Sequence, residues 1–292
     1  MLNKWNPLVT VGVTSFNSEK TIERAIKTAL NQTWSNKEIV IVDDASNDET
    51  RNIINRYKKH LEIRIYMRES NGGVGQVRND IINYAKGEYI AFFDDDDESD
   101  PSRIQMQFKK LIEEEKKNPS KNGFLCFTGR NLINENKKIY IPPLHKIGVR
   151  KPIALSGTTA ASFILAGINN HNIYGSTATC TLFCRLQVLK NLGRFDAEFR
   201  RSEDTEFAAR AGRQGAKFIS INRALVSQYP SDGIEKENHN ELQNTLLYIE
   251  KHKDFINELS SAFFCKEWIK LKFSLREFAL AKTLQSFFKI LI

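Results

Sequence analysis

A run of carboxylates follows a strongly apolar stretch in the first half of the chain. The sequence YIAFF at residues 89–93 leads directly into four aspartates and a glutamate, and Asp100 follows closely. Neighbouring carboxylates repel one another, and no lysine or arginine lies within the run to offset them. Asp94 and Asp96 are spaced as a pair of oxygen ligands, which Mg²⁺ and Mn²⁺ prefer. The pattern predicts a metal site at this pair, with a solvated acidic turn as the alternative.

Asp44 and Arg78 are further groups that can bind a ligand. Asp44 ends the apolar run IVIV, and its carboxylate can accept the imide N–H of a uracil or thymine ring. Arg78 follows the glycine-rich turn at 71–76, and its guanidinium suits a phosphate or a pyrimidine carbonyl. The alternative for Asp44 is that it and Asp43 only cap the following turn.

The pair Glu203–Asp204 begins an amphipathic helical pattern. A carboxylate at this point can act as a general base that deprotonates an acceptor hydroxyl. It can equally be a helix cap, because the helix dipole favours negative charge at the N-terminus. We interpret Asp100, which precedes Pro101, as such a cap and not as a ligand.

The elements that would position these groups alternate between strands and helices. Strand-like runs are expected at 8–14, 37–46, 61–69 and 89–93, and helical patterns at 19–34, 48–60, 77–87 and 102–117. The alternation predicts a doubly wound, mostly parallel α/β sheet flanked by helices. Ligands of such sheets bind at the carboxyl ends of the strands, so Asp44 and Asp94 are expected on one rim.

The rest of the chain is less regular. Strands are expected at 124–133 and 177–185, a helix at 186–192, and a mobile loop near the site at 139–176. The last 60 residues have a helical pattern. We therefore predict a catalytic domain at 1–232 and a helical C-terminal extension at 233–292. The catalytic domain would comprise a nucleotide-binding half at about 1–123 and an acceptor-side half at about 124–232.

Composition indicates a globular protein of 292 residues, with 41% hydrophobic residues and a net charge of +8. A basic balance suits anionic partners or a lysine-rich solubilising surface, and no nucleic-acid-binding module is recognisable. No run is long enough for a membrane-spanning helix, and a strand pattern begins too early for a signal peptide. The four cysteines match no zinc or redox spacing, and we interpret them as core residues of a cytoplasmic protein: Cys126, Cys180, Cys184 and Cys265.

Taken together, these stretches resemble the family 2 glycosyltransferases, whose catalytic domain has the GT-A fold. The resemblance covers roughly residues 7–232 and rests on segments that include LVTVGVTSFNSEK, EIVIVDDASNDET, GEYIAFFDDDDESDP and LGRFDAEFRRSEDTEF. It implies an inverting transfer from a nucleotide-sugar, with a UDP-sugar favoured, and a divalent cation, Mn²⁺ or Mg²⁺. The acceptor would be a glycan or lipid-linked hydroxyl in surface polysaccharide, lipopolysaccharide or glycoconjugate synthesis. A processive polymerase would carry a QxxRW-type motif and membrane helices, so their absence favours transfer of a single sugar.

The resemblance also implies roles for individual residues. Asp44 would contact the nucleobase, Asp94 and Asp96 would form the metal-binding DxD, and Asp204 would be the catalytic base. The nucleotide-binding positions would be Thr14, Ser15, Phe16, Asp44, Arg78, Asp94 and Asp95. Many members have basic or histidine residues after a tyrosine beyond the ED pair, whereas proline follows Tyr229 here. The groups that bind the diphosphate therefore stay open, with His239 as one candidate.

The segment 262–292 mixes aromatic and aliphatic residues with lysine and arginine. Such a helix can lie on an anionic membrane surface, which would place the protein on the inner face of the cell membrane and favour a lipid-linked acceptor. It can equally pack on the catalytic domain or on a second subunit. Two other functions stay open: a haloacid dehalogenase-type phosphohydrolase, which also has a DxD after an apolar strand, and a non-catalytic nucleotide- or carbohydrate-binding module.

Overall fold

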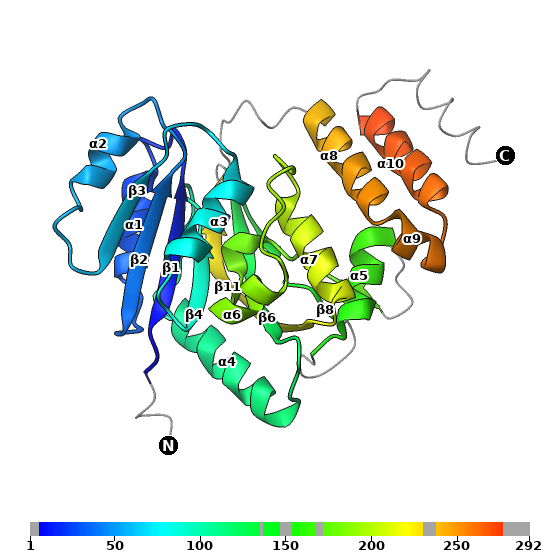
Figure 1. The fold of residues 1–292 in the computed structure, drawn as a ribbon, viewed down its shortest axis with the longest axis horizontal. Helices are drawn as coiled ribbons and strands as arrows, with labels where there is room; N and C mark the ends of the chain where they lie inside the picture. The colour runs from blue at the N-terminus through cyan, green and yellow to red at the C-terminus, as the bar shows by residue number, and fades with distance from the viewer. Residues whose placement is uncertain (1–5, 135–136, 147–153, 167–171, 230–237, 277–292) are drawn as a thin grey trace.

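The computed structural model describes residues 6–134, 137–146, 154–166, 172–229 and 238–276. The strands are β1 (Val9–Ser15), β2 (Lys37–Asp43), β3 (Ile63–Met67), β4 (Tyr89–Phe93), β5 (Glu98–Ser99), β6 (Phe124–Asn134), β7 (Lys137–Ile141), β8 (His145–Lys146), β9 (Ile173–Tyr174), β10 (Phe183–Arg185) and β11 (Lys217–Gln228). The helices are α1 (Ile22–Leu30), α2 (Thr50–Asn55), α3 (Val74–Tyr84), α4 (Arg103–Lys117), α5 (Gly157–Ala166), α6 (Leu186–Asn191), α7 (Glu203–Arg213), α8 (Asn238–Lys251), α9 (Lys253–Leu259) and α10 (Ala262–Arg276). The predicted α/β class is confirmed (Figure 1).

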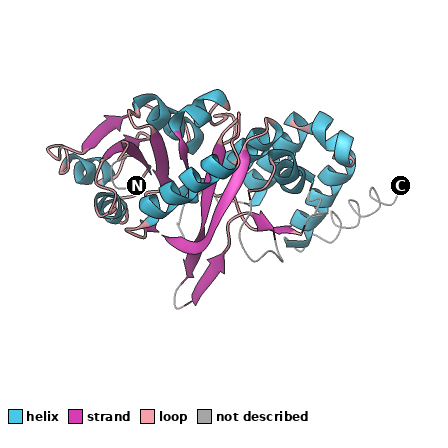
Figure 2. Cartoon of the chain, turned by 90° about the horizontal axis from the view of Figure 1, so that it is seen from below, coloured by secondary structure: helices cyan, strands magenta, loops and turns pink. Residues whose placement is uncertain are grey.

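Most of the strands form one mixed sheet in the order β3-β2-β1-β4-β10-β6-β11-β5, with β7 paired to β6. β3, β2, β1 and β4 are parallel neighbours, as the helices between them predict. β10 runs antiparallel to β4 and β6, and β11 runs parallel to β6. Because β1, β2 and β4 run in the same direction, the residues that follow them lie along one edge of the sheet. Figure 2 shows the molecule from below, with the strands in magenta and the helices in cyan.

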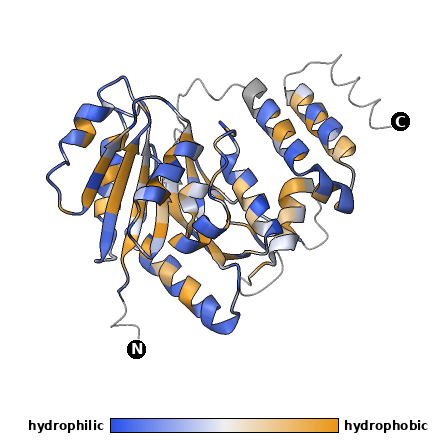
Figure 3. Cartoon of the chain, in the orientation of Figure 1, coloured by the Kyte–Doolittle hydropathy of each residue, from blue (hydrophilic) through white to orange (hydrophobic). Residues whose placement is uncertain are grey.

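Strands β1, β2 and β4 are buried along nearly their whole length because helices cover both faces of the sheet. Along β2, Ile39 and Ile41 belong to a core with residues of α1 and α4, while Val40 and Val42 belong to the opposite core. The opposite core contains residues of α3, α6 and α7. Figure 3 shows this arrangement as apolar strands between helices that carry polar residues on their outer sides.

Two predicted elements differ from the structure. The strand expected at 177–185 is limited to β10, and Thr179–Thr181 form a 3₁₀ turn in its place. The hydroxyl of Thr181 donates to the carbonyl of Ala178 at 2.8 Å, a local bond that competes with pairing in a sheet. Cys180 and Cys184 are nevertheless buried, as predicted, and all four cysteines are free.

The loop expected at 139–176 contains the helix α5, so that prediction is wrong over Gly157–Ala166. This helix packs on α7 where Gly157 meets Gly212. A Cβ on either glycine would collide with the backbone of the other, so the two helices approach closely only because both positions lack a side chain. The contact supports the helix that begins with Glu203 and Asp204.

The helical pattern of the C-terminal extension is confirmed over α8, α9 and α10. These helices share a core with α5 and α7, and the hydroxyl of Tyr248 donates to the carbonyl of Ile164 at 2.7 Å. The terminal residues 277–292 lie outside the described part of the chain. In the part that is described, every helix is too short or too polar to cross a membrane.

Candidate active site

The aspartate run lies at the carboxyl end of β4, against the end of β1. The backbone N–H of Phe16 donates to Oδ2 of Asp95 at 2.8 Å, and the hydroxyl of Thr14 lies 3.5 Å from Oδ1 of Asp94. Burial raises the pKa of Asp95 to about 7, although the hydrogen bond from Phe16 opposes this shift. The end of β1 and the acidic run therefore form one structural unit.

Asp97 is the buried member of the run, with 4% of its surface exposed. Neither of its carboxylate oxygens has a well-formed hydrogen bond within the described part of the chain. Burial, together with the charges of Asp94 and Asp96, raises the pKa of Asp97 well above its ordinary value. Ligand atoms of Asp94, Asp97 and Cys180 lie within 4.8 Å of one another. The two carboxyl groups offer oxygen ligands of the kind that Mg²⁺ and Mn²⁺ prefer, and the third member of the group is a buried thiol.

Arg78 connects the acidic run to the start of α7. Its guanidinium donates to Oδ1 of Asp94 at 3.0 Å and to Oε1 of Glu203. Both Arg78 and Glu203 are buried. Burial acts against the charge of Arg78, yet Asp94 and Glu203 raise the pKa of its guanidinium above the ordinary value. Burial raises the pKa of Glu203, and Arg78 opposes that shift. The ion pairs hold two sequence motifs together although the chain separates them widely.

Asp204 lies on the wall of a cleft of about 840 Å³. Ser202, in the left-handed region with φ of 62°, turns the chain into α7 just before Asp204. The Oδ1 atom of Asp204 accepts the N–H of Thr205 at 2.7 Å, and the side chain is half-buried. The other residues that line the cleft are Thr14, Val74, Arg78, Asp94, Asp95, Asp96, Arg130, Leu132, Ile133, Asn134, Arg200, Arg201, Ser202, Glu203, Gln228 and Tyr229. A carboxylate at this place can accept a proton from a hydroxyl bound beside the acidic run.

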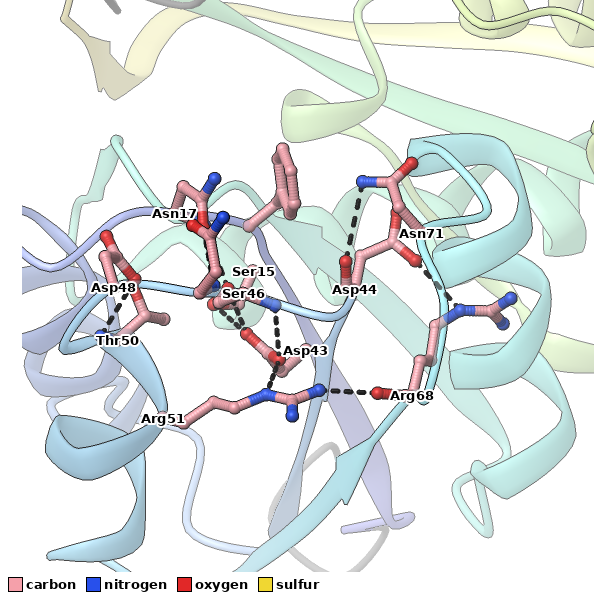
Figure 4. Close-up of polar contacts among 12 residues, drawn as sticks. Ser15, Asn17, Asp43, Asp44, Ser46, Asp48, Thr50, Arg51, Arg68 and Asn71 are labelled. Carbon is pink, nitrogen blue, oxygen red and sulfur yellow. Dashed lines mark hydrogen bonds and ion pairs between the residues drawn. The ribbon is translucent and has the colours of Figure 1, made fainter.

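Asp44 fixes the glycine-rich turn that leads into α3. Its Oδ1 and Oδ2 atoms accept the N–H groups of Gly72 and Gly73, both at 2.8 Å. Nε of Arg68 lies 2.8 Å from Oδ1, and the side-chain amide of Asn71 donates to the carbonyl of Asp44 (Figure 4). A carboxylate offers about four lone pairs. These contacts therefore leave Asp44 an acceptor position on Oδ2.

Asp43 stabilises a turn, as the alternative for the 43–44 pair predicts. Its carboxylate accepts the N–H of Ser46 at 3.0 Å and Nε–H of Arg51 at 2.7 Å (Figure 4). Ala45, which lies between Asp43 and Ser46 in the sequence, has a positive φ of 62°. The cap predicted at Asp100 differs from the structure, in which Ser102 precedes α4 and no side chain caps the helix. Oδ1 of Asp100 instead accepts the N–H of Ser102 at 2.8 Å in the turn before the helix.

The predicted site residues divide into two groups. The cleft brings together Thr14, Arg78, Asp94, Asp95, Asp96 and Asp204. The other three, Ser15, Phe16 and Asp44, lie next to it: the Ser15 hydroxyl is 3.5 Å from Asp43, and the Asp44 N–H donates to the Ser15 carbonyl at 2.8 Å. His239 has no described side chain, and residues 230–237 lie outside the described part.

Sequence reasoning missed four groups at or beside the cleft: Arg130, Arg200, Arg201 and Asp97. For Arg200 and Arg201 the sequence offered a signal, because only Ser202 separates these two basic residues from the ED pair in FRRSED. Arg130 carried no comparable signal, since its partners come from distant segments: Gln228 and Ser176.

Comparison with known proteins identifies the family of the chain. The model of the family described as "Glycosyl transferase family 2" matches residues 10–185, which is more than half of the chain. The chain belongs to this family. Among curated relatives, it is 32% identical over 136 residues to TuaG of Bacillus subtilis, a glycosyltransferase named for teichuronic acid biosynthesis. That match covers 46% of this chain and 51% of TuaG, so it spans about half of the relative's length.

Solved structures of glycosyltransferases confirm the GT-A fold. TarS residues 1–349 from S. aureus, in complex with UDP-GlcNAc, superpose with a TM-score of 0.62 at 19% identity. The match covers 95% of this chain and 88% of that one. The mannosyltransferase PcManGT from Pyrobaculum calidifontis, in complex with GDP-Man and Mn²⁺, gives 0.59 at 16% identity, with 95% and 76% covered. The GT-A fold leaves the haloacid dehalogenase alternative without support.

Proposed function

We propose that this family 2 chain is an inverting glycosyltransferase that moves one sugar from a nucleotide-sugar to an acceptor hydroxyl. A UDP-sugar is the favoured donor, and the acceptor belongs to surface polysaccharide, lipopolysaccharide or glycoconjugate synthesis. The observation that carries the proposal is the bridge formed by Arg78 between Asp94 and Glu203, because it keeps the acidic run and Asp204 on one cleft. Residues 1–232 would act as the catalytic domain and 233–292 as a helical extension.

A divalent cation, Mn²⁺ or Mg²⁺, fits the acidic run. Oxygen ligands dominate there, and Asp97 places a buried carboxyl group beside Asp94. Asp94 and Asp96 would hold the ion, and Asp97 would add its charge from behind them. When bound, the ion would offset the negative charge of the departing diphosphate.

The protein's own groups would bind the donor and manage one proton. The backbone of Thr14, Ser15 and Phe16 would line the nucleotide pocket, and the remaining acceptor position of Asp44 would take the nucleobase imide N–H. Asp204 would accept the proton of the attacking hydroxyl, which displaces the nucleoside diphosphate with inversion at the anomeric carbon. Arg78 would orient Asp94 and Glu203 toward the same ligand.

A thermal-shift screen of UDP-sugars with and without Mn²⁺, combined with a UDP-release assay, tests the proposal. We expect Mn²⁺-dependent stabilisation of the wild-type protein by a donor, since binding to the folded state alone raises its stability. Asp96→Ala should lose that stabilisation. Asp204→Asn should keep it but should release UDP about 100-fold more slowly, whether the sugar passes to an acceptor or to water.

Asp254→Asn provides the matched control, since Asp254 is exposed on α9. This variant should behave as the wild-type protein in both assays. Unchanged donor binding in Asp96→Ala would contradict the metal site, and wild-type UDP release in Asp204→Asn would contradict the catalytic base. Binding without any turnover in the wild-type protein would favour the non-catalytic module.

A further inference from the structure

Arg130, on β6, lines the cleft and forms hydrogen bonds to uncharged side chains. Its Nε–H donates to Oε1 of Gln228 at 2.8 Å, and an Nη1–H donates to the hydroxyl of Ser176 at 2.8 Å. Gln228 ends β11, and Ser176 precedes the 3₁₀ turn, so three separate segments fix the guanidinium. Two tethers on a half-buried side chain indicate a defined orientation.

Among the residues that the structure describes, Arg130 forms no salt bridge with a carboxylate, whereas Arg78 in the same cleft forms two. A guanidinium keeps its charge and offers five N–H donors, of which the two tethers use two. Holding such a charge in a partly desolvated cleft is unfavourable unless an anion completes it. A planar fork of free donors suits the two oxygens of a carboxylate or a phosphate.

The position of Arg130 separates it from the nucleotide side of the cleft. In the sheet, β6 lies beyond β10, on the far side of β4 from β1 and β2. The proposed nucleotide contacts at Thr14 and Asp44 follow β1 and β2, and the acidic run follows β4. A donor that extends from β2 across β4 would therefore reach Arg130 with its sugar, or would meet the acceptor there.

We propose that Arg130 binds an oxyanion, a carboxylate or a phosphate, carried by the transferred sugar or by the acceptor. This inference rests on the proposed function and narrows its substrate class to charged sugars. The fixed guanidinium would recognise the anionic group and would discriminate against the neutral sugar of the same shape, because the neutral form leaves Arg130 without a direct ion pair.

Two pairs of probes distinguish the two sources of the oxyanion. UDP-glucuronic acid and UDP-glucose differ only in a carboxylate on the sugar, and calorimetric titration with Mg²⁺ present measures their affinities for the wild-type protein. Glucose 6-phosphate and glucose probe the acceptor side by ligand-observed NMR, with UDP and Mg²⁺ held saturating. We expect the wild-type protein to prefer the charged member of one pair by about tenfold or more, as for a hydrogen-bonded charge pair.

Arg130→Gln should remove that preference, and Arg130→Lys should keep part of it because the charge stays while the fork is lost. Arg223→Gln is the control, since that arginine is exposed on β11 and does not line the cleft. The affinity for UDP alone should be the same in all four proteins, which also shows that the variants are folded.

A wild-type protein that binds UDP but prefers neither charged probe overturns the inference and leaves the proposed function standing. A preference that persists in Arg130→Gln also overturns it, and failure of the wild-type protein to bind UDP overturns both.

Discussion

Arg103 places a positive charge in the core directly behind the acidic run. It has no exposed surface, and its guanidinium donates to the carbonyls of Phe92 and Leu182 and to the side chains of Ser99 and Gln107. Phe92 precedes the acidic run and Ser99 follows it, so one side chain joins the two ends of that segment. At the residue scale, Arg78 thus contacts Asp94 of the acidic run from the cleft, and Arg103 contacts the residues that flank the run from the core.

Arg103→Met should destabilise the protein by about 3 kcal/mol or more, because it leaves several buried acceptors without a donor. Urea unfolding of the two proteins measures the difference. Arg223→Met, at an exposed position, should change the free energy of unfolding by less than about 0.5 kcal/mol. Equal stability of Arg103→Met and the wild-type protein would show that the guanidinium does not support the segment.

At the element scale, the sequence predicted best the segments whose environment is uniform. β1, β2 and β4 are buried on both faces, so their apolar runs indicate strands without ambiguity. α5 escaped prediction because small residues dominate the start of its short sequence, and its position depends on contact with α7. The acidic positions could be predicted because they follow strands directly, whereas the surroundings of Arg130 depend on pairing between distant segments.

The helix α7 is connected to the extension by a buried polar cluster. Oε1 of Glu206 accepts Nε–H of Arg210 at 2.8 Å and lies 3.4 Å from Nε2 of His252, and Nδ1 of His252 is 2.9 Å from Nη1 of Arg213. Burial acts to raise the pKa of Glu206, but His252 and Arg210 outweigh it and hold the pKa below its ordinary value. The charged carboxylate therefore stabilises the junction between α7 and the extension.

A lowered pKa in the folded state means stability that is present above the ordinary value of 4.5 and is lost as the pH falls through the folded value. Glu206→Gln should therefore lower the Tm at pH 7, and the difference from the wild-type protein should shrink progressively below about pH 4.5. Differential scanning calorimetry from pH 3 to pH 8 measures this profile. Glu258→Gln, at an exposed position on α9, should follow the wild-type protein throughout. A Tm difference that does not vary with pH would assign the effect to packing and not to charge.

At the scale of the whole molecule, some side chains of α10 are buried in the protein and others are exposed to solvent. Cys265 and Leu271 are buried, whereas Phe263, Phe264 and Trp268 are 59%, 44% and 44% exposed. The rings of Phe264 and Trp268 stack with centroids 6.4 Å apart. Packing on the catalytic part, one of the two roles predicted for this segment, thus accounts for the buried residues only. These exposed aromatics are far in sequence from the residues of the proposed site. The protein carries a net charge of +8, which favours attraction to anionic surfaces.

We expect these three aromatics to hold the protein on an anionic bilayer, since each aromatic side chain gains about 1.5 to 3 kcal/mol when fully buried and basic residues add attraction to anionic lipid. In a flotation assay, the wild-type protein should float with vesicles that contain phosphatidylglycerol and less with pure phosphatidylcholine. A variant with serine at Phe263, Phe264 and Trp268 should stay at the bottom with both. The matched control replaces three apolar residues exposed elsewhere, Leu61, Ile139 and Tyr174, by serine and should float as the wild-type protein does. Equal flotation of the two triple variants would mean that this face of α10 does not bind the bilayer.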